Sequence, residues 1–195
     1  EYSHDGTGDY EKDIEKRYEH GEFFNADSIK LNTTKTYRTA KGRLVYGGGG
    51  IMPDVFVSLD TSYNTKYLAE LFNNNIIREY ALTYVTDHRR ELDKTTYDDF
   101  RRKFTVTDAM LKQMTDMAAR DGVQFREKDF QRSKTYIATQ TKALIARTAW
   151  RRSEKDGLNN EYYQITLEQD PVFQTAFKSF PKAVALEQGK VASSK

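Results

Sequence analysis

Apolar side chains recur at helical spacing along most of the chain from residue 61 onward, and this periodicity restricts the fold more than any other feature. The longest stripe predicts a helix from about Glu127 to Ser153. Its members are Phe130, Ile137, Thr141, Leu144, Ile145 and Thr148. A second stripe has the i, i+1, i+4, i+5 pattern of an apolar helix face and consists of Ile76, Ile77, Tyr80, Ala81, Tyr84 and Val85. The sequence therefore predicts a multi-helix domain with an apolar interior.

Residues that favour helix ends mark several boundaries. Thr107 and Asp108 predict the start of a helix, and Gly122 predicts its end. Asp170 followed by Pro171 predicts an N-cap and a proline in the first turn, where the missing N–H costs little. The apolar face of that last helix consists of Val172, Phe173, Ala176, Phe177 and Phe180. Further helices are expected over residues 9–20 (ending at Gly21), from Thr61, over 97–104 and over 160–167.

Strand signals are confined to the first 60 residues. Short β-prone runs occur at Ile29–Leu31, Thr36–Thr39 and Leu44–Tyr46, and the glycine run Gly47–Gly50 precedes the apolar Val55–Val57. We therefore expect a mainly α fold with a small β segment, in the α+β class. Residues 1–60 should form one part, and residues 61–195 a helical domain with a disordered tail after about residue 187.

The composition argues against several classes of protein. The formal charge of +2 comes from 31 basic and 29 acidic side chains with interleaved signs, so we expect no dedicated nucleic-acid binding. The absence of cysteine excludes disulfides, thiol catalysis and cysteine-ligated metals. No stretch approaches 18 apolar residues, so we expect no transmembrane segment. The chain begins at Glu1 rather than methionine, and we expect it to be excised from a longer protein.

No residue pattern predicts a catalytic, cofactor or metal site. The run Gly47–Gly50 is followed by Ile51, Met52 and Pro53 instead of the Lys-Ser/Thr of a phosphate-binding loop, so a close-packed strand connection is favoured. No histidine has metal-ligand spacing to another ligand, and the three are His4, His20 and His88. No serine lies in a nucleophile motif, so we expect caps or surface hydroxyls at Ser28, Ser58, Ser62, Ser133 and Ser153.

Three arginine doublets are the remaining candidates for ligand contact. Arg89-Arg90, Arg101-Arg102 and Arg151-Arg152 are basic enough to touch phosphates. Acidic residues flank each doublet in the sequence. Solvated helix faces with ordinary ion pairs are therefore the favoured interpretation.

One block, Thr39–Val57, reads TAKGRLVYGGGGIMPDVFV. It closely resembles the T-x-x-G-R-x-V-Y-G-G-G-G-I-x-P-D pattern of carboxyl-terminal processing peptidases, also called tail-specific proteases. The motif residues in this chain are Gly42, Arg43, Gly47, Gly48, Gly49, Gly50, Pro53 and Asp54. Arg17–Phe24 and Lys142–Arg147 also look like the longer members from Gram-negative envelopes, so the resemblance covers roughly residues 10–180.

This resemblance implies a serine peptidase with a Ser/Lys dyad, in which a neutral lysine is the general base. A PDZ domain in such proteins captures the substrate's C-terminus. In the family both dyad residues precede the glycine block, and no serine or lysine here matches either motif, so no catalytic residue is carried over. The implied partners are the catalytic and PDZ domains of the longer protease, here called the parent protease, together with its protein substrates. The implied location is the periplasm or cell envelope, with no cofactor.

A second hypothesis remains open. The helical region from Thr61 onward is then an independent interaction module that docks a partner or a sister subunit, without protease activity. Homo-oligomerisation through this region is compatible with both hypotheses. The residues upstream of Glu1 would distinguish a protease from a module.

Overall fold

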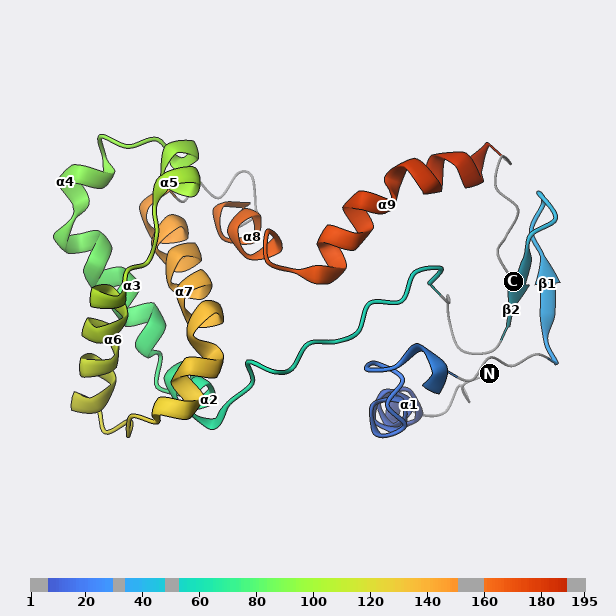
Figure 1. Cartoon of the computed structure of the whole chain (residues 1–195), viewed down its shortest axis with the longest axis horizontal. Helices are drawn as coiled ribbons and strands as arrows, with labels where there is room; N and C mark the ends of the chain where they lie inside the picture. The colour runs from blue at the N-terminus through green and yellow to red at the C-terminus, as the bar shows by residue number, and fades with distance from the viewer. Residues whose placement is uncertain (1–6, 30–33, 48–52, 151–159, 189–195) are drawn as a thin grey trace. The chain divides into compact units, whose positions relative to one another are not determined.

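The structure is a computed structural model that describes residues 7–29, 34–47, 53–150 and 160–188 (Figure 1). The chain divides into two compact units. Unit 1 comprises Glu1–Asp60 and Thr175–Lys195, and unit 2 comprises Thr61–Gln174. The described residues are mostly helical and carry one two-stranded antiparallel sheet. This confirms the predicted mainly α fold with a small β segment.

Unit 2 is built from helices on either side of one long helix. In chain order they are α2 (Lys66–Asn73), α3 (Ile76–Asp87), α4 (Arg89–Leu92), α5 (Tyr97–Lys103), α6 (Asp108–Arg120), α7 (Glu127–Trp150) and α8 (Asn160–Leu167). Helix α7 packs against α2, α3, α5 and α8, and α3 also packs against α6. The predicted long helix is therefore the centre of the unit, although its last predicted residues, 151–153, lie outside the described part of the chain.

The predicted apolar stripes form the core of unit 2. The largest fully buried apolar side chains are Tyr67, Leu71, Ile76, Ile77, Met114, Ile137 and Ile145. In α7 the stripe is buried at Phe130, Ile137 and Ile145, whereas Thr148 at the end of the stripe is exposed. Burying this apolar surface is the main favourable contribution to folding of the unit.

Most helix caps lie at the residues that the sequence predicts. Thr107 accepts the Met110 backbone N–H at 3.3 Å, and Gly122 follows α6 with a φ of +83°, a left-handed conformation that glycine adopts at little cost. The helix expected from Thr61 begins later, at Lys66, because Thr65 takes the N-cap and accepts the Leu68 N–H at 3.1 Å.

Unit 1 contains short elements. They are α1 (Thr7–Glu19), a 3₁₀ turn (Ala26–Ser28), β1 (Thr36–Arg38), β2 (Leu44–Tyr46) and the part of α9 (Pro171–Glu187) that begins at residue 175. Helix α1 ends as predicted before Gly21, whose φ is +76°. The expected strand at Ile29–Leu31 lies largely outside the described residues, and Val55–Val57 is not a strand. A short apolar segment becomes a strand only when a neighbouring strand pairs with it. The two described strands, β1 and β2, pair only with each other.

Helix α9 begins as the sequence predicts but does not bury its apolar face. Asp170 caps it by accepting the Phe173 N–H at 2.9 Å, and Pro171 occupies the first turn. Phe177 and Phe180 are 65% and 63% exposed, and no residue of α9 is buried. None of the described helices is long and apolar enough to cross a membrane.

Candidate functional site

The motif block forms a β-hairpin whose turn depends on one glycine. The Gly42 N–H donates to the Thr39 carbonyl at 2.8 Å, and the Thr39 N–H donates to the Arg43 carbonyl at 2.9 Å. Gly42 has a φ of +80°, so the three-residue loop is a turn followed by a left-handed residue, a common hairpin connection. The Arg38 guanidinium also donates to the Gly42 carbonyl at 2.8 Å, which holds the end of the turn against β1.

The hairpin continues past its two strands to Gly47. The register pairs Tyr37 with Val45, and the Gly47 N–H donates to the Lys35 carbonyl at 2.7 Å. A Cβ at position 47 would lie 2.6 Å from ring atom Cε2 of Tyr37. Any side chain at this position therefore displaces the exposed Tyr37 ring, so glycine at position 47 allows the ring to pack closely on the backbone.

An ion pair joins two further motif residues. The Arg43 guanidinium contacts the Asp54 carboxylate, which ties the segment after the glycine run back to β2. Pro53 precedes Asp54 in a segment that is neither helix nor strand. Gly48, Gly49 and Gly50 lie outside the described residues. The structure thus places Gly42 and Arg43 in one hairpin and brings Asp54 into contact with it.

Two of the candidate serines, Ser58 and Ser133, form structural hydrogen bonds through their hydroxyls. Ser58 donates its hydroxyl to the Phe24 carbonyl at 3.0 Å and is exposed, as expected for a surface hydroxyl. The prediction for Ser133 is wrong, because its side chain is fully buried within α7. Its hydroxyl donates to the Tyr63 carbonyl at 2.7 Å and lies 2.8 Å from the Thr65 hydroxyl. A small polar residue lets α7 approach this loop and satisfies its backbone, so Ser133 is a packing residue. Ser153 lies outside the described residues.

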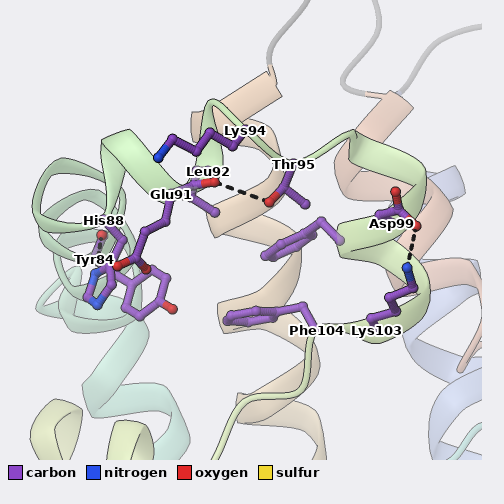
Figure 2. A pocket seen from close by; sticks show the side chains of 10 residues that line it. Tyr84, His88, Glu91, Leu92, Lys94, Thr95, Asp99, Lys103 and Phe104 are labelled. Atoms are coloured by element: carbon purple, nitrogen blue, oxygen red, sulfur yellow. Dashed lines mark hydrogen bonds and ion pairs between the residues drawn. The ribbon is translucent and has the colours of Figure 1, made fainter.

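A pocket of about 450 Å³ lies in unit 2, between the end of α3 and α5 (Figure 2). We call it the α3–α5 pocket. It is lined by Tyr84, His88, Glu91, Leu92, Lys94, Thr95, Asp99, Phe100, Lys103 and Phe104. Its volume is in the range typical of sites for small ligands and peptide side chains.

Two stacked ring pairs form the walls of the α3–α5 pocket. Tyr84 on α3 and His88, the residue after α3, stack with centroids 4.1 Å apart and planes 14° apart. Phe100 and Phe104 stack at 4.3 Å and 21°. Tyr84 also meets Phe104 edge to face at 5.8 Å, so the two stacks contact each other. His88 Nδ1 lies 2.9 Å from the Tyr84 carbonyl, so Nδ1 carries the hydrogen and the ring is held in place.

The charges at the pocket rim are unequally satisfied. Asp99 accepts from Lys103 at 2.8 Å and from the Thr96 hydroxyl at 3.1 Å, and it lies 3.5 Å from Arg102. The hydrogen bonds from Lys103 and then Thr96 are the main causes that lower the pKa of Asp99. Glu91 and Lys94 form no ion pair with any residue in the described ranges. Figure 2 shows the Glu91 side chain pointing toward Tyr84 and His88. Burial and, secondarily, the Glu91 charge raise the pKa of the Tyr84 hydroxyl, so the Glu91 carboxylate interacts electrostatically with this ring of the pocket wall.

Sequence reasoning did not identify this pocket. The sequence showed only that His88 lacks metal-ligand spacing, and the structure makes it part of a pocket wall. The spacing of Tyr84 and His88, and of Phe100 and Phe104, is i, i+4, which predicts side-chain pairs on single helices. The neighbouring sequence does not predict that the two ring pairs face each other, because their positions depend on how the chain turns through α4 between α3 and α5.

The other sequence candidates are accounted for by ordinary interactions. Arg89 pairs with Asp93 at 2.9 Å, and Arg101 pairs with Glu168 at 2.6 Å, as expected for solvated helix faces. Arg151 and Arg152 lie outside the described residues, as does His4. Within the part of the chain that is described, no group of three or more His, Asp or Glu side chains could hold a metal ion.

A family of unknown function (DUF8443) matches residues 67–151 of this chain. The matched segment lies inside unit 2, extends over helices α2 to α7 and contains every residue of the α3–α5 pocket. The hairpin with the glycine block lies outside it. No curated protein and no solved structure is significantly similar to the chain. The similarity to this family therefore concerns the helical unit and assigns no activity to it.

Proposed function

We propose that this chain is the non-catalytic C-terminal portion of a carboxyl-terminal processing serine peptidase of the cell envelope. The observation that carries the proposal is the glycine-rich motif block at Thr39–Val57. Its folding supports the proposal, because Gly42, Arg43 and Gly47 have structural roles in one hairpin and Asp54 pairs with Arg43. In this proposal the Ser/Lys dyad and the PDZ domain belong to the preceding part of the parent protease.

The lack of burial in unit 1 is consistent with a segment that packs into a larger domain. No described residue of unit 1 is buried. A two-stranded hairpin on its own is at best marginally stable in water, and it leaves both outer strand edges open for pairing. Strands and apolar side chains of the catalytic domain would supply the missing pairing and burial.

The first test measures activity of the chain alone. The purified chain is incubated with peptides that have free C-termini, and we expect no hydrolysis above the buffer blank. Robust hydrolysis by this chain would contradict the assignment. A coding sequence upstream of Glu1 without a PDZ domain and a Ser/Lys motif would also contradict it.

The second test uses the full-length parent protease. Gly47→Val should lower its yield of folded, active enzyme, because the new side chain collides with the Tyr37 ring. Ala40→Val is the control, since Ala40 is exposed in the hairpin loop and should tolerate a valine side chain. Equal activity of the two variants would remove the structural role assigned to the motif.

A second candidate function is an independent helical interaction module. It is favoured by the complete core of unit 2 and by a family match that ends within that unit. The two functions can coexist in one protein, with unit 2 regulating or oligomerising the protease. Light scattering of the chain over a wide concentration range tests oligomerisation, and a strictly monomeric result would exclude it.

A further inference from the structure

We propose that the α3–α5 pocket binds the guanidinium group of a single arginine in a peptide segment of a partner protein. The assignment does not depend on the protease hypothesis, because every lining residue lies between positions 84 and 104 of unit 2. It rests on the ring geometry, on one carboxylate without an ion-pair partner, and on the size of the pocket.

The aromatic walls provide the first half of the recognition. The α3–α5 pocket is lined by the Tyr84–His88 stack and by the Phe100–Phe104 stack. The Phe100 ring also contacts the Trp150 ring at a centroid distance of 4.7 Å. Faces of aromatic rings attract cations through their quadrupole. Guanidinium is planar and weakly hydrated, so it stacks on such faces at a lower desolvation cost than an ammonium.

Glu91 provides the second half. It is exposed at the rim, points toward the Tyr84 and His88 rings in Figure 2, and has no ion-pair partner among the described residues. The other carboxylate, Asp99, is already neutralised by Lys103 and Arg102. One acceptor therefore remains for an incoming cation, and a carboxylate can accept two parallel N–H bonds from a guanidinium.

The volume favours an arginine within a peptide over a small cation. The pocket holds about 450 Å³, which leaves room for the whole side chain and part of the neighbouring backbone. Lys94, which also lacks an ion-pair partner in the described ranges, is exposed at the same rim. Its charge disfavours ligands with several positive groups and favours a single arginine flanked by neutral or acidic residues.

The test is an NMR titration of the full chain with the tripeptide acetyl-Gly-Arg-Gly-amide. We expect saturable shifts of the amide signals of residues 84–104. The matched peptide with citrulline in place of arginine has the same shape without the charge and should bind at least about fivefold more weakly. Absence of saturable shifts at millimolar peptide, or equal binding of the citrulline peptide, would overturn the proposal. Free L-arginine that binds more tightly than the tripeptide would overturn the assignment to a peptide.

Two variants locate the binding to the pocket. Glu91→Gln should weaken binding of the arginine peptide about tenfold, because it removes a charge-assisted hydrogen bond. Asp93→Asn is the matched control: it removes the same charge two residues away, from an ion pair with Arg89 that does not line the pocket. Both variants change exposed side chains, and an unchanged amide spectrum outside residues 84–104 verifies the fold. Equal affinities of the two variants would refute the role of Glu91.

Discussion

The two units differ in whether they contain a core of their own. Every buried residue in the described part of the chain lies in unit 2, where seven helices enclose apolar side chains around α7. Unit 1 has comparable apolar material at Tyr37, Leu44, Phe177 and Phe180, but each of these side chains is exposed. The difference shows that apolar content alone does not make a core, since burial also requires enough elements to cover one another.

The contrast extends to how backbone polar groups are satisfied. In unit 2 side chains from distant segments satisfy the backbone, as when Lys142 on α7 donates to the Arg101 carbonyl at 2.7 Å near the end of α5. Burial is the main cause that lowers the pKa of this lysine. In unit 1 most hydrogen bonds of the hairpin join residues close to its own turn, and its bond to a distant backbone group, from Lys41 to the Glu187 carbonyl, is exposed to solvent. Unit 2 is therefore expected to unfold as one cooperative body, and unit 1 to open at little cost.

Hydrogen exchange of the full chain should show the largest difference. Backbone amides of Ile137, Thr141 and Ile145 in α7 should exchange at least on the order of a thousandfold more slowly, relative to unstructured peptides, than those of Thr39 and Gly47 in the hairpin. The reason is that the α7 amides open only with the core. Residue-resolved exchange by NMR measures both sets at once. Similar protection factors in the two sets of amides would contradict the statement that unit 1 opens more easily than unit 2.

Truncation of apolar side chains should separate the units by stability. Ile137→Ala should lower the free energy of unfolding by about 2–5 kcal/mol, because the side chain is 0% exposed and its removal leaves a cavity. Phe180→Ala, which removes a larger side chain that is 63% exposed, should change it by less than about 0.5 kcal/mol. Urea denaturation followed by far-UV circular dichroism gives both values. A loss at Phe180 as large as that at Ile137 would mean that α9 is covered in solution.

The sequence predicts features that depend on neighbouring residues. The caps at Thr107 and Asp170 and the stops at Gly21 and Gly122 all depend on a few adjacent positions, and the structure confirms them. The helical stripes are predicted for the same reason, since a period of 3.6 can be counted along the chain.

Features that depend on distant residues are not predicted. Nothing near Ser133 in the sequence indicates that it is buried against the loop before α2. Nothing near Tyr63 in the sequence indicates that its ring stacks on Tyr136 at 4.2 Å. The α3–α5 pocket likewise requires Tyr84 and Phe104, which are twenty positions apart, to meet across α4. The family resemblance adds an expected function for the hairpin, which stays a prediction.

Two serine substitutions sharpen the comparison at the level of single hydrogen bonds. Ser133→Ala should destabilise the chain by about 1–3 kcal/mol, because it leaves the Tyr63 carbonyl and the Thr65 hydroxyl without their buried partner. Ser58→Ala in unit 1 removes one bond from an exposed hydroxyl, and water replaces it, so the change should stay below about 0.5 kcal/mol. Urea denaturation measures both. Equal effects would show that burial does not set the strength of these bonds.

The smallest expected effect concerns a hydroxyl inside the core of unit 2. Tyr67 is 0% exposed, and its hydroxyl has no hydrogen-bond partner among the described residues. Tyr67→Phe should therefore leave the stability at pH 7 unchanged or raise it by up to about 1 kcal/mol. Tyr80→Phe is the matched control: its hydroxyl donates to Gln113 at 3.0 Å, and loss of that bond should cost about 1 kcal/mol.

Alkaline pH tests the same hydroxyl independently. Burial, with a smaller contribution from Glu70, raises the pKa of Tyr67 to about 12 from the ordinary value of 10.0. Between these values the folded protein retains a proton that the unfolded chain has released, so stability present below pH 10 is lost as the pH rises toward 12. Both Tyr67→Phe and Tyr80→Phe should reduce this alkaline loss, since burial also raises the pKa of Tyr80 to about 12. Only Tyr80→Phe should also weaken the protein at pH 7. Urea midpoints between pH 7 and 12 test both statements, and an undiminished alkaline loss in Tyr67→Phe would place that hydroxyl in contact with solvent.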